Sequence, residues 1–346
     1  FSNKFYAPNL SELAKHATEG GIEELAYQEE LAPILWCRRG DGALSGTTYR
    51  RIRLFSSEHP IFNAWHRNTL GSGRTITSIC VGPSVDGNLD ALSTVTKDPE
   101  TGVYHVEIMT AIFDEEAPIE AAWFVDNAVI PIAGETITSG GSSYIRFHGL
   151  YHLEGKKVSV FAAGLDCGDY TVASGYVDVP LGVAASGEFT NKFLQQVTAA
   201  PVDPEPGIGD LTVHIDEGML RIPCVIGFTY TSQGQLCRPS GQTETGARQG
   251  SVTGAGFGKV RRLHGIVALL HKAKGISFGT SFSKLRPAKL LTDGGAVLGK
   301  TELFSGIYKG DLQDTYSLDG MLCWQISRPY PATVVSLGGF LSTQDE

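Results

Sequence analysis

The chain has 346 residues, a formal net charge of −9 and 19% charged residues. This length corresponds to two or three domains and is sufficient for a large buried core without disulfide bridges. The 42% hydrophobic content excludes a disordered chain, and no apolar run is long enough to cross a membrane. The acidic balance argues against tight nucleic-acid binding by phosphate neutralisation. The 42 glycines and 16 prolines favour short elements joined by tight turns.

The first predicted element is an α-helix that starts near Asn9 and ends at Gly20-Gly21. Asn9 and Glu12 have capping-box spacing, and glycine often follows the last turn of a helix. One helical face carries the apolar residues Leu10, Leu13, Ala14 and Ala17. A second, short helical turn is expected over residues 22–27.

After this helix the chain has the pattern of β-strands. Residues 34–39 and 44–49 flank Asp41-Gly42, and an Asp-Gly pair between such runs predicts a β-hairpin because glycine supplies a positive φ. The further strands expected in this region cover residues 62–67, 75–81, 89–96 and 103–109. Strands at such short, regular intervals are typical of propeller blades or sandwiches.

A polar break at residues 114–118 precedes a second set of strands. These strands are expected over residues 157–162, 170–172, 175–179, 211–215 and 220–230. Two stretches rich in glycine, proline, serine or threonine, residues 199–209 and 239–258, are predicted to be loops.

The segment from Gly294 to Thr301 matches the phosphate-binding pattern G-x-x-x-x-G-K-T at Gly294, Gly299, Lys300 and Thr301. In a true P-loop the backbone amides hold phosphates, the lysine reaches the β/γ oxygens and the threonine binds magnesium. That chemistry needs a buried strand before the loop and a helix after it, and neither pattern is present. We therefore interpret the match as a glycine-rich turn before an extended strand, and expect no nucleotide cofactor.

Other candidate sites have simpler interpretations. Arg39-Gly40-Asp41 matches an adhesion tripeptide, but its place at a hairpin tip accounts for it. The pairs His148/His152 and His264/His271 lack a further ligand at metal spacing, so no metal site is expected. The six cysteines form no C-x-x-C pair, which predicts free thiols.

Two charged stretches leave alternatives open. The acidic residues 114–116 and Glu120 are interpreted as a solvated loop rather than as paired catalytic carboxylates. A basic stretch could be a solvated face or a patch that touches a partner or passing DNA. It consists of Lys259, Arg261, Arg262, His264, His271, Lys272 and Lys274.

Six segments, taken in chain order, resemble a known family. They are residues 10–28, 34–49, 64–67, 149–158, 225–232 and 319–335. Each is similar to a segment of the tail nozzle proteins of short-tailed bacteriophages, also called tail tubular or stabilisation proteins. The most distinctive is residues 149–158, Gly-Leu-Tyr-His-Leu-Glu-Gly-Lys-Lys-Val. The stretch from about residue 181 to residue 217 is longer than the family usually carries.

The resemblance implies a mainly β fold with β-propeller-like strands, an inserted small β-barrel and one N-terminal helix. The expected parts are residues 1–118, a propeller-like β region with the leading helix; residues 119–222, the inserted barrel; and residues 223–346, a C-terminal β region that returns to the propeller.

The resemblance also implies a virion structural protein that is not an enzyme and has no catalytic residues. Such proteins form a ring, usually a hexamer, at the distal end of the tail, and double-stranded DNA leaves through its lumen. The expected partners are a tail adaptor ring and tail fibres. The protein is expected to be assembled in the host cytoplasm and to reside in the virion tail, without cofactor, metal or membrane segment.

Two alternatives remain open from the sequence. One is a tail-tip or fibre-docking protein of another phage tail type, built from the same modules. The other is a P-loop nucleotide hydrolase that uses Lys300.

Overall fold

The structure is a computed structural model of residues 1–346. It describes the chain except for a set of segments and single positions. These are residues 1–8, 13, 31, 52–60, 85–86, 88, 111–112, 114–118, 120–121, 123, 130–133, 163, 181–213, 217–218, 222–223, 237–259, 293–294, 300–301, 313–315, 318–320 and 344–346. The expected loops at residues 199–209 and 239–258, and the acidic residues 114–116 and Glu120, lie outside the described residues.

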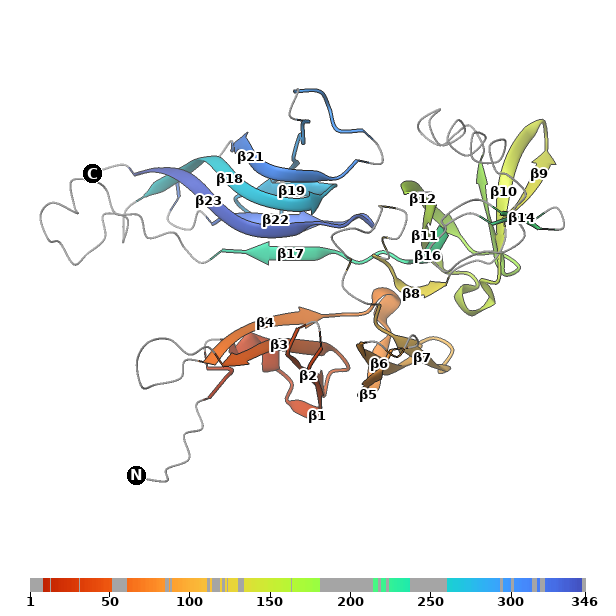
Figure 1. The fold of residues 1–346 in the computed structure, drawn as a ribbon, viewed down its shortest axis with the longest axis horizontal. Helices are drawn as coiled ribbons and strands as arrows, with labels where there is room; N and C mark the ends of the chain where they lie inside the picture. The colour runs from red at the N-terminus through yellow and green to blue at the C-terminus, as the bar shows by residue number, and fades with distance from the viewer. Residues whose placement is uncertain are drawn as a thin grey trace, which may run out of the picture. The chain divides into compact units, whose positions relative to one another are not determined.

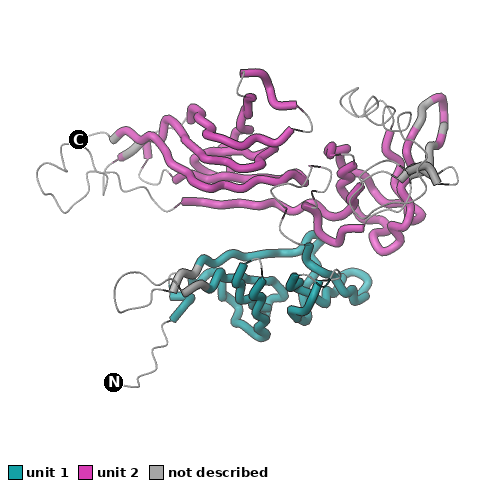
Figure 2. The backbone as a smooth tube through the Cα atoms, viewed as in Figure 1, with its two compact units in different colours: residues 1–112 teal, residues 113–346 magenta. Residues whose placement is uncertain are grey.

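The protein is mainly β, as the sequence predicts. The chain divides into two compact units, residues 1–112 and 113–346 (Figure 2). The described strands form six sheets, and every strand pairing in them is antiparallel (Figure 1). The propeller arrangement and the boundaries expected after residues 118 and 222 stay predictions.

The first unit contains two sheets that share one core. The first is β1-β2-β3-β4, with strands Ile22–Gln28, Ile34–Arg39, Leu44–Arg51 and Ile61–Asn68. The second is β5-β6-β7, with strands Thr75–Pro83, Asp90–Lys97 and Tyr104–Ile108. A short 3-10 helix, η2 (Gly71–Gly73), lies between them in the chain. The buried core consists of Trp36, Leu44, Ile76, Ile79 and Leu92.

The predicted hairpin at Asp41-Gly42 is confirmed. Gly42 has φ 79°, and strands β2 and β3 pair from Ile34↔Thr48 to Arg38↔Leu44. The Asp41 carboxylate accepts the Ala43 N–H at 3.1 Å and thereby closes the turn. This is the local hydrogen bond that makes aspartate common in turns.

The predicted N-terminal α-helix is wrong. The chain forms only one turn of 3-10 helix, η1 (Lys15–Thr18). Asn9 accepts the Ser11 N–H at 3.1 Å in a local turn. The local backbone bonds span three residues, from the Ala14 N–H to the Ser11 carbonyl and from the Ala17 N–H to the Ala14 carbonyl, and Ala14 has the non-helical angles φ −132° and ψ 42°. The Ala17 carbonyl, in the last turn of the expected helix, accepts a 2.6 Å bond from the Ser45 hydroxyl and a 3.3 Å bond from Arg39. The segment is thus a series of short turns that is bound to the β2–β3 hairpin.

The helical turn expected at residues 22–27 is also wrong, because these residues form β1. Its side chains alternate between two faces. Glu24 and Ala26 face the second sheet and the core, whereas Leu25 and Tyr27 are exposed. Pairing with β2 along the whole strand overrides the local helical pattern.

The second unit begins with a module of two sheets, named the inserted module after the expected insertion, which stays a prediction. One is β12-β11-β16-β8, with strands Leu165–Thr171, Lys157–Ala162, Cys224–Phe228 and Asp126–Val129. The other is β13-β10-β9-β15-β14, with strands Tyr176–Pro180, Ser142–His148, Gly134–Ser139, Met219–Arg221 and His214–Asp216. Both sheets contribute to a core that includes Ile145, Phe147, Val160, Val177 and Ile226.

The expected inserted small β-barrel is not closed in the described residues. The two sheets meet at a tight turn, where an isolated bridge joins Ala173 to Tyr176. At their other edges, β8 and β14 pair only within their own sheets among the described strands. The module is therefore a pair of open sheets around one core.

The C-terminal part of the unit contains two further sheets. One is β17-β22-β19-β20, with strands Ser232–Gln235, Cys323–Ile326, Ile276–Gly279 and Leu285–Pro287. The other is β21-β18-β23, with strands Phe304–Asp311, Arg261–Ala273 and Thr333–Thr343. The alternate residues Ile266, Ala268 and Leu270 of β18 are buried in one core together with Phe278 and Ile326.

The core of the inserted module generates a stability prediction. Ile226 is 0% exposed in that core. Ile226→Ala should lower the free energy of unfolding by about 2–5 kcal/mol, because the truncation leaves a cavity in a packed interior. Thermal and urea denaturation measure the change. The control, Ile307→Ala, removes a side chain that is 63% exposed and should shift it by no more than about 0.5 kcal/mol. Equal effects of both variants would contradict the described core.

Candidate functional site

The P-loop-like segment folds as a turn in its described part. Leu291 and Val297 form an isolated β-bridge, and the Gly295 N–H donates to the Thr292 carbonyl at 2.8 Å. The Gly299 N–H donates to the Glu302 carboxylate at 2.9 Å. The next strand is β21, so the described residues do not follow the strand–loop–helix order of a P-loop.

A phosphate-binding loop needs free backbone N–H groups that converge on an anion. Here a carboxylate already occupies the Gly299 N–H, and a second anion would be repelled there. Gly294, Lys300 and Thr301 lie outside the described residues. That the segment binds no nucleotide stays a prediction.

The Arg39-Gly40-Asp41 tripeptide has a structural role. The Arg39 side chain is 2% exposed and bonds both carboxylate oxygens of Asp41, at 3.1 and 2.6 Å. It also donates to the carbonyls of His16 and Ala17. An arginine that is buried in this way fixes η1 to the β2–β3 hairpin, and its guanidinium is turned away from solvent.

The histidines of the sequence analysis lie in separate places, and Lys259 lies outside the described residues. His264 and His271 both lie in β18, where His264 stacks on Phe340 at 6.3 Å and His271 approaches the Ser305 hydroxyl at 3.4 Å. His148 lies against Tyr176 in the other module. The described residues contain no cluster of three or more metal-ligating side chains.

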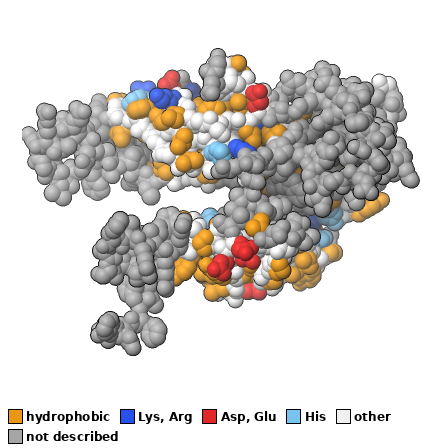
Figure 3. Space-filling view, in the orientation of Figure 1, with side chains coloured by type: hydrophobic (Ala, Val, Ile, Leu, Met, Phe, Trp, Pro, Cys, Tyr) orange, Lys and Arg blue, Asp and Glu red, His pale blue; other side chains and the backbone are white. Residues whose placement is uncertain are grey.

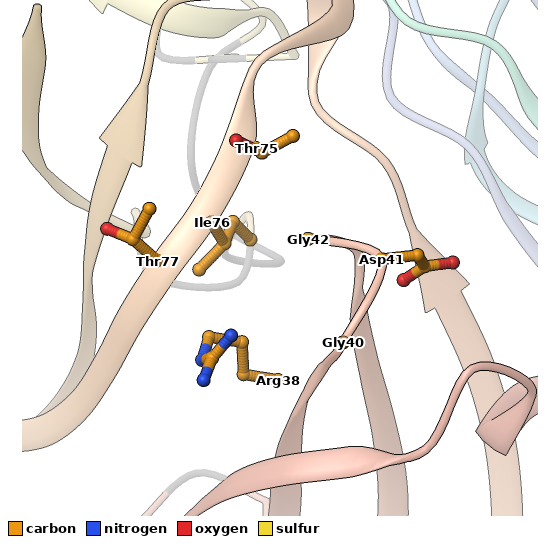
Figure 4. A pocket seen from close by; sticks show the side chains of 7 residues that line it. All are labelled: Arg38, Gly40, Asp41, Gly42, Thr75, Ile76 and Thr77. Atoms are coloured by element: carbon orange, nitrogen blue, oxygen red, sulfur yellow. The ribbon is translucent and has the colours of Figure 1, made fainter.

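A small cavity of about 270 Å³ lies in the first unit, between the β2–β3 turn and the start of β5 (Figure 4). Gly40, Asp41 and Gly42 line one side, and residues 75–77 line the other. Arg38 also lines it, but this guanidinium is bonded to Glu23 at 2.8 Å and to Glu24 at 3.1 Å. Its charge is therefore already compensated, and the cavity offers little to an anionic ligand.

Glu24 is the electrostatic centre of this corner. Burial alone would raise its pKa. Hydrogen bonds from the Ser78 hydroxyl, the Ile79 N–H and Arg38 outweigh that effect and hold the pKa of Glu24 below its usual value. The carboxylate thus joins β1, β2 and β5 as a structural anion.

The segment at residues 149–158 forms a compact corner of the inserted module. Leu150 and Leu153, around the 3-10 turn η4 (Tyr151–Leu153), are both 0% exposed. The Glu154 carboxylate accepts the N–H groups of Ser174 and Gly175, each at 2.7 Å. These contacts explain why the segment combines leucines, glutamate and glycines, and they assign it a structural role.

An ion-pair cluster joins the inserted module to the C-terminal sheets. Arg328, after β22, bonds both carboxylate oxygens of Asp166 and donates to Asp169 at 2.9 Å. Lys157 also contacts Asp169, at 3.1 Å. Burial would raise the pKa of Asp169, but the hydrogen bonds from Arg328 and Lys157 hold it below its usual value.

Aromatic packing reinforces the same joint. Phe161 of β11 meets Tyr330 edge to face at 5.8 Å, and Lys274 lies 5.4 Å from the Tyr330 ring. Burial raises the pKa of Tyr330 to about 12. Sequence reasoning missed this joint, because Asp166 and Arg328 are 162 residues apart and no local pattern connects them.

The apolar side chains of β7 form an exposed row on the first unit, as Leu25 and Tyr27 do on β1. Tyr104, Val106 and Ile108 are 57%, 77% and 51% exposed. The opposite side of β7 is polar because Glu107 accepts a 2.6 Å bond from the Thr96 hydroxyl and pairs with the buried Arg74. The usual alternation is therefore reversed, with the apolar side outward. The sequence shows that apolar and polar residues alternate along residues 104–108, but it does not show which of the two sets faces solvent.

The sheet β21-β18-β23 of the second unit also has an apolar outer face. Leu269 of β18 stands opposite Ile307 of β21, and they are 40% and 63% exposed. Val335 and Phe340 of β23 are 58% and 54% exposed. Figure 3 shows hydrophobic side chains on the visible face of each unit. Exposed apolar surface of this kind is typical of protein–protein contact.

Comparisons with known proteins give no identification. No protein-family model matches the chain, and none of the curated proteins searched matches it. In the described part of the chain, no helix is long and apolar enough to span a membrane.

The Arg328 joint can be tested by substitution. Arg328→Gln removes the cation from Asp166, which is only 13% exposed, and should destabilise the joint by about 2 kcal/mol. Arg328→Lys keeps the charge but loses the bidentate hydrogen bonding to Asp166, so an intermediate loss of stability is expected. Hydrogen exchange of β11 and β12 reports the change. Unchanged exchange in Arg328→Gln would show that the joint contributes nothing.

The nucleotide interpretation can be tested by titration. We expect no saturable binding of ATP with magnesium in isothermal calorimetry, because the Gly299 N–H already donates to Glu302. Lys300→Ala should give the same trace as the natural chain. Measurable affinity that Lys300→Ala abolishes would establish a working P-loop.

Proposed function

We propose that this protein is a structural subunit of a bacteriophage tail, and that copies of it form a nozzle ring through which the genome leaves the virion. The ring is a hexamer at the distal end of the tail and contacts a tail adaptor ring and tail fibres. The protein acts as a conduit without catalysing a reaction. The observation that carries the proposal is the exposed apolar row on β7, which suits a subunit that is covered in an assembly.

The sequence resemblance supplies the kind of assembly. The six similar segments occur in the order in which tail nozzle proteins carry them. The most distinctive of them, residues 149–158, builds a corner from buried leucines and the Glu154 carboxylate. A corner of this kind maintains a fold, which is what a mechanical component needs.

The exposed apolar rows support assembly. Tyr104, Val106 and Ile108 lie on one side of one strand and form a continuous stripe. Burying such side chains contributes about 1.5–3 kcal/mol each, so a neighbour that covers the stripe gains substantial stability. Leu269 and Ile307 offer a second surface of the same kind in the other unit.

The charge balance suits a conduit. With 37 acidic and 28 basic residues the chain repels the phosphates of passing DNA on average. A conduit that held its cargo tightly would slow ejection. The antiparallel sheets form a scaffold that resists deformation.

The proposal predicts a ring that depends on β7. The chain, co-expressed with the tail proteins of its phage, should appear as a ring on the tail axis in electron microscopy, with a hexameric mass in native mass spectrometry. Val106→Asp places a charge in the apolar stripe and should reduce ring assembly at least tenfold, since a buried unpaired carboxylate is costly.

The matched control is Val297→Asp, at a residue that is 82% exposed in the turn at residues 291–297. It adds the same charge outside the stripe and should leave the ring intact. A chain that stays monomeric with its tail partners, or lies away from the tail axis, would contradict the proposal.

A further inference from the structure

Strand β23 (Thr333–Thr343) is an edge strand without the usual protection. In the described part of the chain it pairs with β18 alone, at one end of the sheet order β21-β18-β23 (Figure 1). Its eleven residues include no charged side chain and no proline. Natural edge strands usually carry one or the other, because an open edge is a template for another strand.

Other edge strands of this protein do carry such residues. β21, at the opposite edge of the same sheet, has Lys309 and Asp311. β20 has Arg286 and Pro287, and β1 has Glu23 beside Glu24. β17 (Ser232–Gln235) also lacks both, but it has only four residues, and a very short edge strand offers little to pair with. Among these edge strands, β23 combines an uncharged, proline-free sequence with a length of eleven residues.

The part of β23 from Ser336 to Ser342 is regular. Val335 is bulged, because Leu269 pairs with Ser336 and Leu270 with Val334. From Ser336 onward each residue of β23 has a partner in β18, and the one extra residue, His264, belongs to β18. Leu337, Gly339 and Leu341 lie on the core side, and Ser336, Gly338, Phe340 and Ser342 lie on the outer side.

We propose that β23 pairs antiparallel with β23 of a second copy of this chain, across a two-fold axis at Gly339. Leu337 then stands opposite Leu341 of the second copy, and Ser336 stands opposite Ser342. Phe340 stands opposite Gly338, where there is no side chain to obstruct it. The two three-stranded sheets become one sheet of six strands.

Charge and register both favour a second copy as the occupant. An uncharged strand places no like charges opposite each other when it pairs with itself. In a paired sheet, residues that stand directly opposite each other point to the same face. If one β23 were shifted by one residue along the other, its core residues would therefore lie on the outer face. A shift by two keeps the faces, but in one direction it brings the bulged Val335 into the pairing, and in the other it places Phe340 opposite Phe340 of the second copy. The register centred on Gly339 avoids both.

This pairing concerns β23 alone and holds whether or not the protein forms a tail ring. A two-fold contact is self-complementary and produces pairs of subunits. A ring about a single axis is built from head-to-tail contacts, so the two-fold pair is a state of the chain outside the proposed ring. The experiments on β7 and on β23 use different variants, so that one proposal can fail while the other stands.

Sedimentation equilibrium of the purified chain, without tail partners, tests the pairing. The natural chain should show a mass of twice 37.0 kDa at micromolar concentration. The double variant Ser336→Glu with Ser342→Glu sets like charges opposite each other at two symmetric places, and should weaken dimerisation about tenfold or more. Ser336→Lys with Ser342→Glu sets opposite charges there and should restore it. Circular dichroism checks that both variants fold.

Cysteine cross-linking reads the register directly. Ser336→Cys with Ser342→Cys should give a disulfide-linked dimer under mild oxidation, and Ser336→Cys alone should not, because residue 336 faces residue 342 of the other copy. A natural chain that stays monomeric at 100 micromolar would overturn the proposal. So would equal dimerisation of the two charge variants, or equal cross-linking of the single and double cysteine variants.

Discussion

Antiparallel pairing of short strands is the constraint on which the structure depends. In the first unit each strand pairs with a sequence neighbour, as in β1-β2-β3-β4 and β5-β6-β7, whereas in the second unit strands far apart in the chain also pair, as in β11-β16 and β18-β23. The sheets formed in this way are small and have two faces and two edges each. The sheets lie in pairs, and each sheet buries one face in the core that it shares with its partner sheet. The other faces and the edges are available for contact. The functional proposals concern these remaining surfaces.

Buried charged groups decide which face of a strand is turned outward. Arg74 is 4% exposed and attracts Glu107, so that the apolar side of β7 faces solvent. Arg39 is also buried and holds the His16 and Ala17 carbonyls of η1 against the β2–β3 hairpin. Arg328 connects two sheet systems through Asp166 and Asp169. In each case an arginine fork organises elements that the hydrophobic pattern alone leaves undetermined.

The sequence predicts the local hairpins and fails where distant groups intervene. Asp41-Gly42 predicts its hairpin because the turn chemistry is contained in a few residues. The segment at residues 9–20 shows a helical pattern, yet it folds as short turns whose Ala17 carbonyl is bound by Arg39 and Ser45 of the β2–β3 hairpin. The outward row of β7 and the Arg328 joint depend on side chains from other strands. No spacing rule in the sequence reports those partners.

One sheet of the inserted module contains two strands that are separated by a long stretch of the sequence. β13 ends at Pro180, β14 begins at His214, and both strands belong to the same five-stranded sheet. The two strands that flank residues 181–213 therefore belong to one framework, whose core includes Val177 and Val179 of β13. Doubling the length of such a connection costs only about 0.6 kcal/mol in closure entropy. This position can accept an added peptide or a fused domain, and related chains can diverge in size here while the framework persists.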